Sequence, residues 1–63
     1  MHNIDLFLHP HQGYGIHTTV SLPAIPHVGE IIIFADHGYL VKSTCYNLDK
    51  DPYTIELAAC QIT

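Results

Sequence analysis

Positively charged side chains are scarce in this sequence. Its 63 residues include two lysines, Lys42 and Lys50, no arginine and six acidic residues, so the formal net charge is −4 with histidine neutral. A protein that binds a nucleic-acid backbone needs several cations to displace condensed counterions. Binding to an anionic membrane surface also depends on clustered basic residues. We therefore expect neither a nucleic-acid partner nor a membrane partner.

Long hydrophobic runs are also absent. No stretch reaches the length of about 18 apolar residues that marks a membrane-spanning helix. The segment "MHNIDLFLHP" has neither the basic region nor the apolar length of a signal peptide. Cysteine is limited to Cys45 and Cys60. We expect a cytoplasmic protein in which both thiols remain reduced.

The short chain limits how much surface folding can bury. Residues 1–63 form one domain, and a domain of this size buries only about 60% of the surface that its unfolded chain exposes. Natural domains this small often rely on a disulfide, a metal or a partner subunit. Only 13% of the residues are charged and 48% are hydrophobic. The surface therefore retains apolar groups, which favours self-association.

Glycine and proline divide the chain into segments of strand length. The segments that predict strands are 3–9, 14–22, 29–36, 39–47 and 53–63. In the first, Ile4, Leu6 and Leu8 share a face. The dipeptide His37-Gly38 predicts a tight hairpin, because both residues tolerate the positive φ of such turns. The stretch "NLDKDP" predicts a second turn, stabilised by side chains that bond to their own backbone.

The last segment, "YTIELAACQIT", fits two structures. As a strand it presents Tyr53, Ile55, Leu57 and Ala59 on one side. As a helix over 53–62 it would have an apolar face at helical spacing, with Asp51 as its N-cap and Pro52 at its first position. We favour a strand because Tyr-Thr-Ile is β-prone. A helix would change the fold class from all-β to α+β.

Five short strands are too few for a sandwich of two full sheets, but a meander of them can curl into a small barrel. "IPHVGEIIIF" followed by "GYLVKSTCYNLDKDPYTIELAAC" resembles the small Src-homology-3-like (SH3-like) barrels of bacterial and phage proteins. The matching positions over residues 25–59 are Pro26, Gly29, Glu30, Tyr39 and Val41. The resemblance implies a five-stranded binding module in an accessory, regulatory or host-interaction role, and it brings no catalytic residues.

Six histidines are present, and His9, His11 and His17 lie within nine positions of one another. A turn at 13–15 would bring His17 back beside the other two, and three imidazoles could hold zinc, nickel or copper. The alternative is an exposed turn whose polar positions are histidine. A third possibility is a response to pH, since protonating all six would take the formal net charge from −4 to +2.

Other patterns for catalysis are weak. Cys45 and Cys60 lie within predicted strands, where a small buried side chain explains them better than a nucleophile does. The carboxylates of Asp49, Asp51 and Glu56 would need a cleft to act as an acid pair. "GYGIH" lacks the lysine and the helix of a phosphate-binding loop. We therefore expect no enzymatic activity and no required cofactor.

A protein interface is the most direct functional inference. Because Ile31 to Phe34 are apolar on both faces, one face of this strand must lie outside a core this small. We assign Ile31 and Ile33 to the core, and Ile32 and Phe34 to an outer face that Leu40 and Tyr46 extend. The predicted contact residues of this surface are Ile32, Phe34, Tyr39, Leu40 and Tyr46, since aromatic anchors dominate interface energetics.

These observations predict a non-enzymatic protein-binding module that self-associates. Its size, its acidity and the resemblance fit an accessory or inhibitor protein of a phage or another mobile element. A histidine-rich metal-binding protein is the alternative. A homodimer would also supply the stability that a chain this short lacks on its own.

Overall fold

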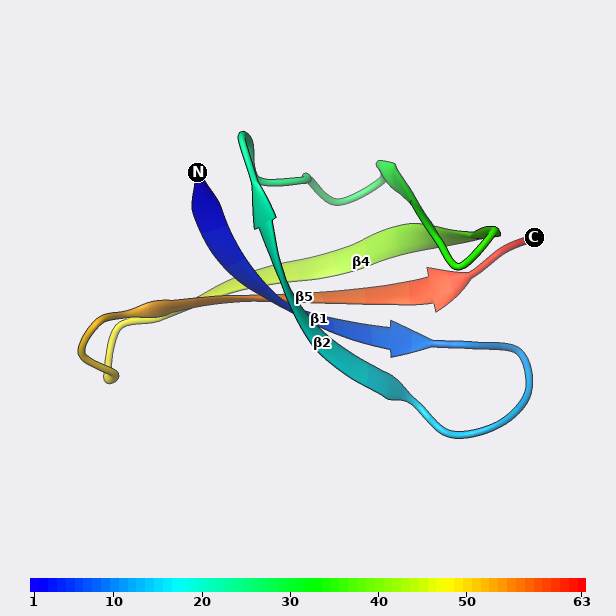
Figure 1. Cartoon of the computed structure of the whole chain (residues 1–63), viewed down its shortest axis with the longest axis horizontal. Coiled ribbons are helices and arrows are strands. Elements are labelled where there is room, and N and C mark those ends of the chain that lie inside the picture. Colours follow the sequence, from blue (N-terminus) through cyan, green and yellow to red (C-terminus); the bar gives the residue numbers. More distant parts are fainter.

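The computed structural model describes residues 1–63, and all of its regular elements are β-strands. The strands are β1 (His2–His9), β2 (Ile16–Leu22), β3 (Ile31–Phe34), β4 (His37–Asn47) and β5 (Thr54–Gln61). They form a single strongly curled sheet (Figure 1). The prediction of a small five-stranded all-β domain is confirmed. The last segment is a strand, so the α+β alternative with a helix at 53–62 is wrong.

The strand order in the sheet is β2-β1-β5-β4-β3. A simple meander would keep the strands in chain order, but here β1 pairs with β5 in parallel at the centre of the sheet, while the other pairs are antiparallel. Strands β2 and β3 therefore lie at opposite edges. The connection 23–30 carries the chain from one edge to the other (Figure 1).

The core lies on the concave face of the sheet. The parallel register places Ile4 opposite Ile55, Leu6 opposite Leu57 and Leu8 opposite Ala59. Alternate residues of a strand share a face, and this is why the predicted set Ile4, Leu6 and Leu8 is buried together. Other side chains pack around this centre. The buried ones are Tyr39 and Val41, and the partly buried ones are Ile16, Val20, Leu22, Ile25, Ile32 and Phe34.

A β-bulge in β4 changes which face its residues occupy. The register to β5 shifts between Val41 and Ser43, leaving Lys42 as the extra residue. Before the bulge, Tyr39 and Val41 point into the core. Beyond it, Tyr46 lies opposite Ile55, a core residue. Leu40 and Tyr46 therefore do not share a face, contrary to the uninterrupted alternation assumed from the sequence.

The hairpin between β3 and β4 turns two residues earlier than the sequence predicts. Phe34 pairs with His37, which leaves Ala35 and Asp36 as the turn. Their φ angles of 50° and 66° are the two positive values that a type I′ turn requires. Gly38 lies within β4 and is buried, and a Cβ there would come within 3.0 Å of Thr63 Oγ1. Glycine at position 38 therefore allows close packing against Thr63 and does not form the turn.

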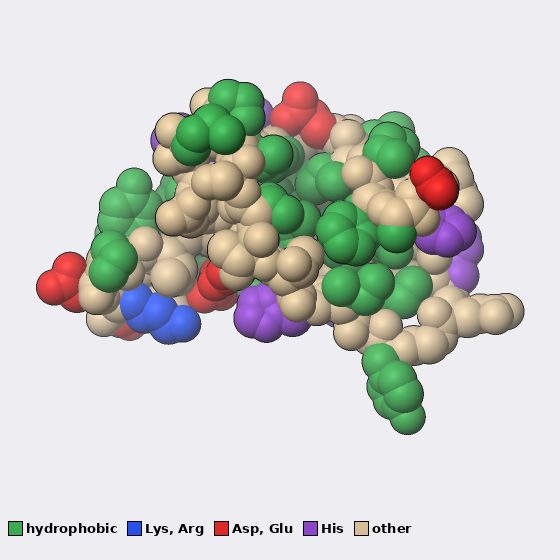
Figure 2. All heavy atoms as spheres, in the orientation of Figure 1, with side chains coloured by type: hydrophobic (Ala, Val, Ile, Leu, Met, Phe, Trp, Pro, Cys, Tyr) green, Lys and Arg blue, Asp and Glu red, His purple; other side chains and the backbone are tan.

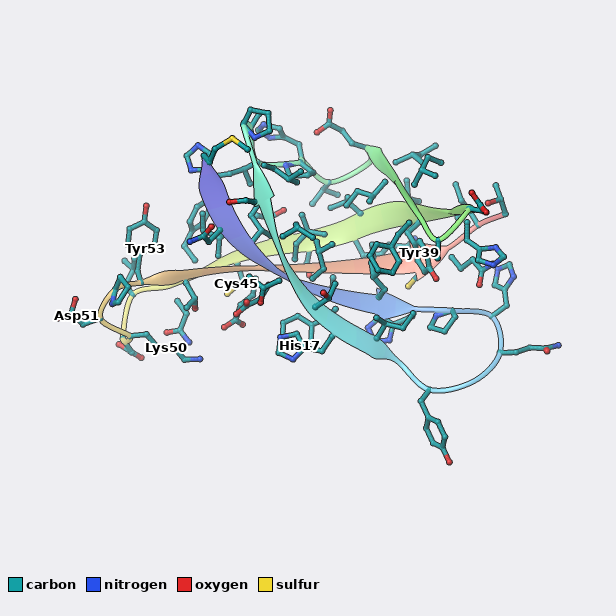
Figure 3. All side chains as sticks on the ribbon, in the orientation of Figure 1. His17, Tyr39, Cys45, Lys50, Asp51 and Tyr53 are labelled. Atoms are coloured by element: carbon teal, nitrogen blue, oxygen red, sulfur yellow. The ribbon has the colours of Figure 1, made fainter.

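The β4–β5 turn follows the predicted mechanism. The backbone N–H of Asp49 donates to Asn47 Oδ1 over 3.1 Å, so a side chain bonds to its own neighbouring backbone. This hairpin extends from one end of the molecule, with Lys50, Asp51 and Tyr53 at and beside its tip (Figure 3). The β1–β2 loop lies at the other end (Figure 1).

Candidate interaction surface

The convex face of the sheet is polar beside β2. Thr19 Oγ1 donates to Asp5 Oδ1 over 2.9 Å, and Ser21 Oγ donates to Asn3 Oδ1 over 2.8 Å. The His17 ring stacks on Phe7, with centroids 4.4 Å apart and planes 11° from parallel. Each of these three pairs joins residues that lie directly opposite each other in the β1–β2 register. The outward side chains of β2 are thus engaged by their own neighbouring strand.

The convex face is apolar beside β3. Ile33 is 71% exposed and Ile31 is 57% exposed, whereas Ile32 and Phe34 pack against the core on the other face. Leu40 lies directly opposite Ile31. Ile62, also exposed, lies near Ile33, since its N–H donates to the carbonyl of Gly38, the residue opposite Ile33. We call strand β3 (Ile31–Phe34), whose outward side chains are Ile31 and Ile33, the isoleucine edge.

The backbone of the isoleucine edge has unused hydrogen-bonding groups. Val41 N–H donates to the Glu30 carbonyl over 2.9 Å, which makes Glu30 and Val41 a bonded pair. In an antiparallel ladder, bonded and non-bonded pairs alternate, so Ile31 and Ile33 are in non-bonded pairs. In agreement, Gly38, opposite Ile33, directs its N–H and its carbonyl to Thr63 and Ile62 instead. The N–H and C=O groups of Ile31 and Ile33 therefore point outward.

The five contact residues predicted from the sequence do not form one surface. Tyr39 is 2% exposed and belongs to the core. Ile32 and Phe34 face the concave side, which reverses their predicted face. Leu40 is half-buried on the convex side, and Tyr46, beyond the bulge, is 52% exposed on the core side. The outward apolar residues of β3 are Ile31 and Ile33, so the prediction that these two face the core is wrong.

The three clustered histidines do not converge on a point. His9 lies opposite Cys60 at the end of β1, and His17 is stacked on Phe7. His11 lies in the loop, where its backbone N–H donates to Gln61 Oε1 over 2.9 Å. No three histidine, cysteine or acidic side chains in the chain could hold a metal ion together. Figure 2 shows histidine side chains at several separate places on one face.

A hollow of about 520 Å³ lies at the end of the sheet, between the β1–β2 loop and the β3–β4 turn. Gln61 joins the two sides, because it accepts from the His11 backbone and its Nε2 lies 3.1 Å from His37 Nδ1. The lining residues are Pro10, His11, Gln12, Tyr14, Ile16, Ala35, His37, Tyr39 and Gln61. This set includes no cysteine, serine or carboxylate to form a nucleophile–base pair with either imidazole.

Both cysteines, with Asp5 and Glu56, lie on the open convex face, whereas the candidate acids Asp49 and Asp51 lie in the β4–β5 turn. Cys45 is exposed and lies opposite Glu56, so it is not the small buried side chain that the sequence suggested. Cys60 is partly buried, and both thiols are free. Glu56 also lies opposite Asp5 in the parallel register. This arrangement places charge on an open convex surface, with no enclosed cleft around Asp5 and Glu56.

No known family, curated protein or solved structure matches the chain. None of its elements is an apolar helix of membrane-spanning length. Of the polar surface beside β2 and the apolar surface beside β3, the isoleucine edge is the more distinctive.

Proposed function

We propose that this chain is a non-enzymatic protein-binding module that accepts a β-strand of a partner at the isoleucine edge. The observation that carries the proposal is the combination of outward backbone groups and outward apolar side chains at the same two residues, Ile31 and Ile33. In strand addition, main-chain hydrogen bonds supply affinity and alternate side chains supply specificity. Both components are available at this edge.

The composition of β3 supports this role. Soluble proteins commonly protect an edge strand with lysine, proline or an inward-pointing charge. β3 has the sequence IIIF and contains none of these. An unprotected apolar edge either binds a partner or leads to aggregation, and a binding role gives the exposed isoleucines a function.

The remaining surface supports a binding role over a catalytic one. Asp5, Glu56 and both thiols lie on an open sheet face, and the end hollow lacks a nucleophile–base pair. The curled five-stranded sheet is compatible with the SH3-like resemblance, which we retain as part of this proposal because such barrels serve as binding modules. The metal-binding alternative is not proposed, since the required ligands do not come together.

The test is capture of binding proteins from a lysate of the organism that encodes the chain. Three immobilised proteins are compared: wild type, Ile33→Lys at the isoleucine edge and Thr19→Lys on β2. Both substitutions add one lysine to the convex face of an edge strand. We expect a protein that binds wild type and Thr19→Lys but is lost with Ile33→Lys. If every captured protein binds all three equally, the proposed site is wrong.

A further inference from the structure

The isoleucine edge is complementary to itself. Accepting the proposed function, we propose that the strand it binds is β3 of a second copy, paired antiparallel about a two-fold axis at Ile32. A symmetric dimer of this kind uses the same surface patch on both subunits. The two sheets then join into one continuous sheet across the axis.

The outward backbone groups select the register. Within each copy, the unpaired N–H and C=O groups belong to Ile31 and Ile33. With the axis at Ile32, Ile31 of one copy lies opposite Ile33 of the other, and each such pair exchanges both of its hydrogen bonds. Centring the axis on Ile33 instead would place Ile31 opposite Ala35, a turn residue of the second copy. Only the Ile32 register satisfies all the outward groups of the strand.

The side chains agree with the same register. On the convex face, Ile31 packs against Ile33 of the second copy, and both are exposed in the single chain. On the concave face, Ile32 lies opposite Ile32 of the second copy. Directly opposed β-branched side chains stabilise an antiparallel pair. Leu40 and Ile62 lie beside the isoleucines, so the apolar surface continues behind the edge.

For a second copy at this site, charge favours antiparallel over parallel pairing. Each copy has a formal net charge of −4, so two copies repel each other over most of their surface. β3 itself is uncharged, with Glu30 before it and Asp36 in the turn after it. An antiparallel pair places Glu30 opposite Phe34 of the second copy. A parallel pair would bring Glu30 close to Glu30, and like charges across a ladder are destabilising.

Self-association is tested by sedimentation velocity over a range of protein concentrations. We expect wild type and Thr19→Lys to show the same monomer–dimer equilibrium. We expect Ile33→Lys to raise the dissociation constant by about tenfold or more, because the axis repeats the added lysine in both copies. Circular dichroism checks that both variants are folded, which is expected because both positions are exposed.

Amide hydrogen exchange tests the hydrogen bonds directly. In the monomer, the outward amides of Ile31 and Ile33 exchange rapidly, whereas the amide of Ile32 is bonded to Tyr39 and exchanges slowly. Raising the protein concentration should slow exchange at Ile31 and Ile33 in wild type and leave it fast in Ile33→Lys. A dimer in which these two amides remain fast would overturn the proposal.

Disulfide trapping tests the register. In a Cys45→Ser, Cys60→Ser background, Ile32→Cys places two thiols in a non-bonded pair on the axis, where Cα atoms about 4.5 Å apart suit a disulfide. We expect Ile32→Cys to form covalent dimers under mild oxidation in preference to Ile33→Cys, whose thiol faces Ile31 of the second copy. The reverse preference would overturn the register.

The outcomes separate this inference from the proposed function. A wild-type protein that remains monomeric at every concentration overturns self-association. The protein-binding function then still stands if lysate proteins are captured in an Ile33-dependent manner, and those proteins are the true occupants. Both proposals fail if wild type is monomeric and no captured protein depends on Ile33.

Discussion

The outward side chains of the two edge strands, β2 and β3, differ in polarity and in their contacts. On β2, the residues His17, Thr19 and Ser21 are each engaged by a residue of β1. On β3, Ile31 and Ile33 are outward, apolar and largely exposed. Both edges contribute partly buried residues to the same core, among them Val20 from β2 and Ile32 from β3. The two edges therefore differ in their outward side chains, although both contribute to the core.

This difference separates a strand that only ends a sheet from one that can continue it. An edge strand offers unpaired backbone groups to any other chain; a proline beside it interrupts that pairing, and outward polar side chains give the other chain no apolar surface to bury. β2 has such side chains and is followed by Pro23. β3 has neither feature along its four residues. One edge of the sheet is thus protected, whereas the other is apolar and open.

The largest effect is expected from the core that both edges share. Leu57 is fully buried on β5, a strand that belongs to neither edge. Leu57→Ala should lower the free energy of unfolding by about 2–5 kcal/mol, because it removes buried methyl groups and leaves a cavity. Ile33→Ala, at an exposed position, should change it by less than about 0.5 kcal/mol. Denaturant unfolding at low protein concentration measures both. Equal losses would show that the isoleucine edge is part of the core.

Exchanging the polarity of the outward side chains on the two edge strands should exchange their tendency to self-associate. Ile31→Thr with Ile33→Thr gives β3 a polar outer face like that of β2, and we expect it to weaken self-association by about tenfold or more. Thr19→Ile with Ser21→Ile gives β2 an apolar outer face, and we expect it to increase self-association. Light scattering across a concentration series measures both. If neither pair changes association, the side chains do not distinguish the edges.

In the hairpin beside each edge, glycine should be more stable than alanine at a position of positive φ. Gly13 has a φ of 90° in the β1–β2 loop, so Gly13→Ala should cost about 1 kcal/mol of stability. Ala35 has a φ of 50° in the β3–β4 turn, so Ala35→Gly should add stability of up to about 1 kcal/mol. Gly15→Ala is the control, because its φ is not positive and its Cβ would meet only the Leu8 carbonyl oxygen, at 3.6 Å. Thermal unfolding compares the three, and a loss of stability in Ala35→Gly would contradict this account of the turn.

The sequence predicted the strand segments better than it predicted which strands pair and where the turns lie. Alternation placed Ile4, Leu6 and Leu8 together, because a regular strand buries every second residue. The parallel β1–β5 pair was missed, because it depends on a connection between distant edges that has no local pattern. The turn was misplaced because His37-Gly38 has favourable turn chemistry, while Ala35 adopts a positive φ that alanine usually avoids.

The sequence predicted an outward apolar face on this strand but not the residues that form it. The apolar run of β3 indicated that some apolar side chains lie outside the core, but an unbroken apolar run contains no polar residue to show which face is outward. The bulge at Lys42 then reversed the alternation that linked Leu40 to Tyr46. The histidine hypothesis had His9 and His17 on the correct, outer face. It failed because His17 stacks on Phe7 and His11 remains in the loop.

The smallest effect is expected from the hydrogen bonds that protect β2. Thr19→Val removes the hydroxyl that donates to Asp5 Oδ1, while preserving side-chain shape and β-branching. Because the pair is exposed, we expect a loss of about 0.5 kcal/mol in the free energy of unfolding. A double-mutant cycle with Asp5→Ala isolates the energy of this hydrogen bond. Beside the other edge, the Thr63 hydroxyl accepts from the Gly38 N–H, so Thr63→Val provides a comparison. Thr19→Val should also increase self-association slightly. If it does not, the protection of β2 lies in its backbone or in Pro23 rather than in its side-chain bonds.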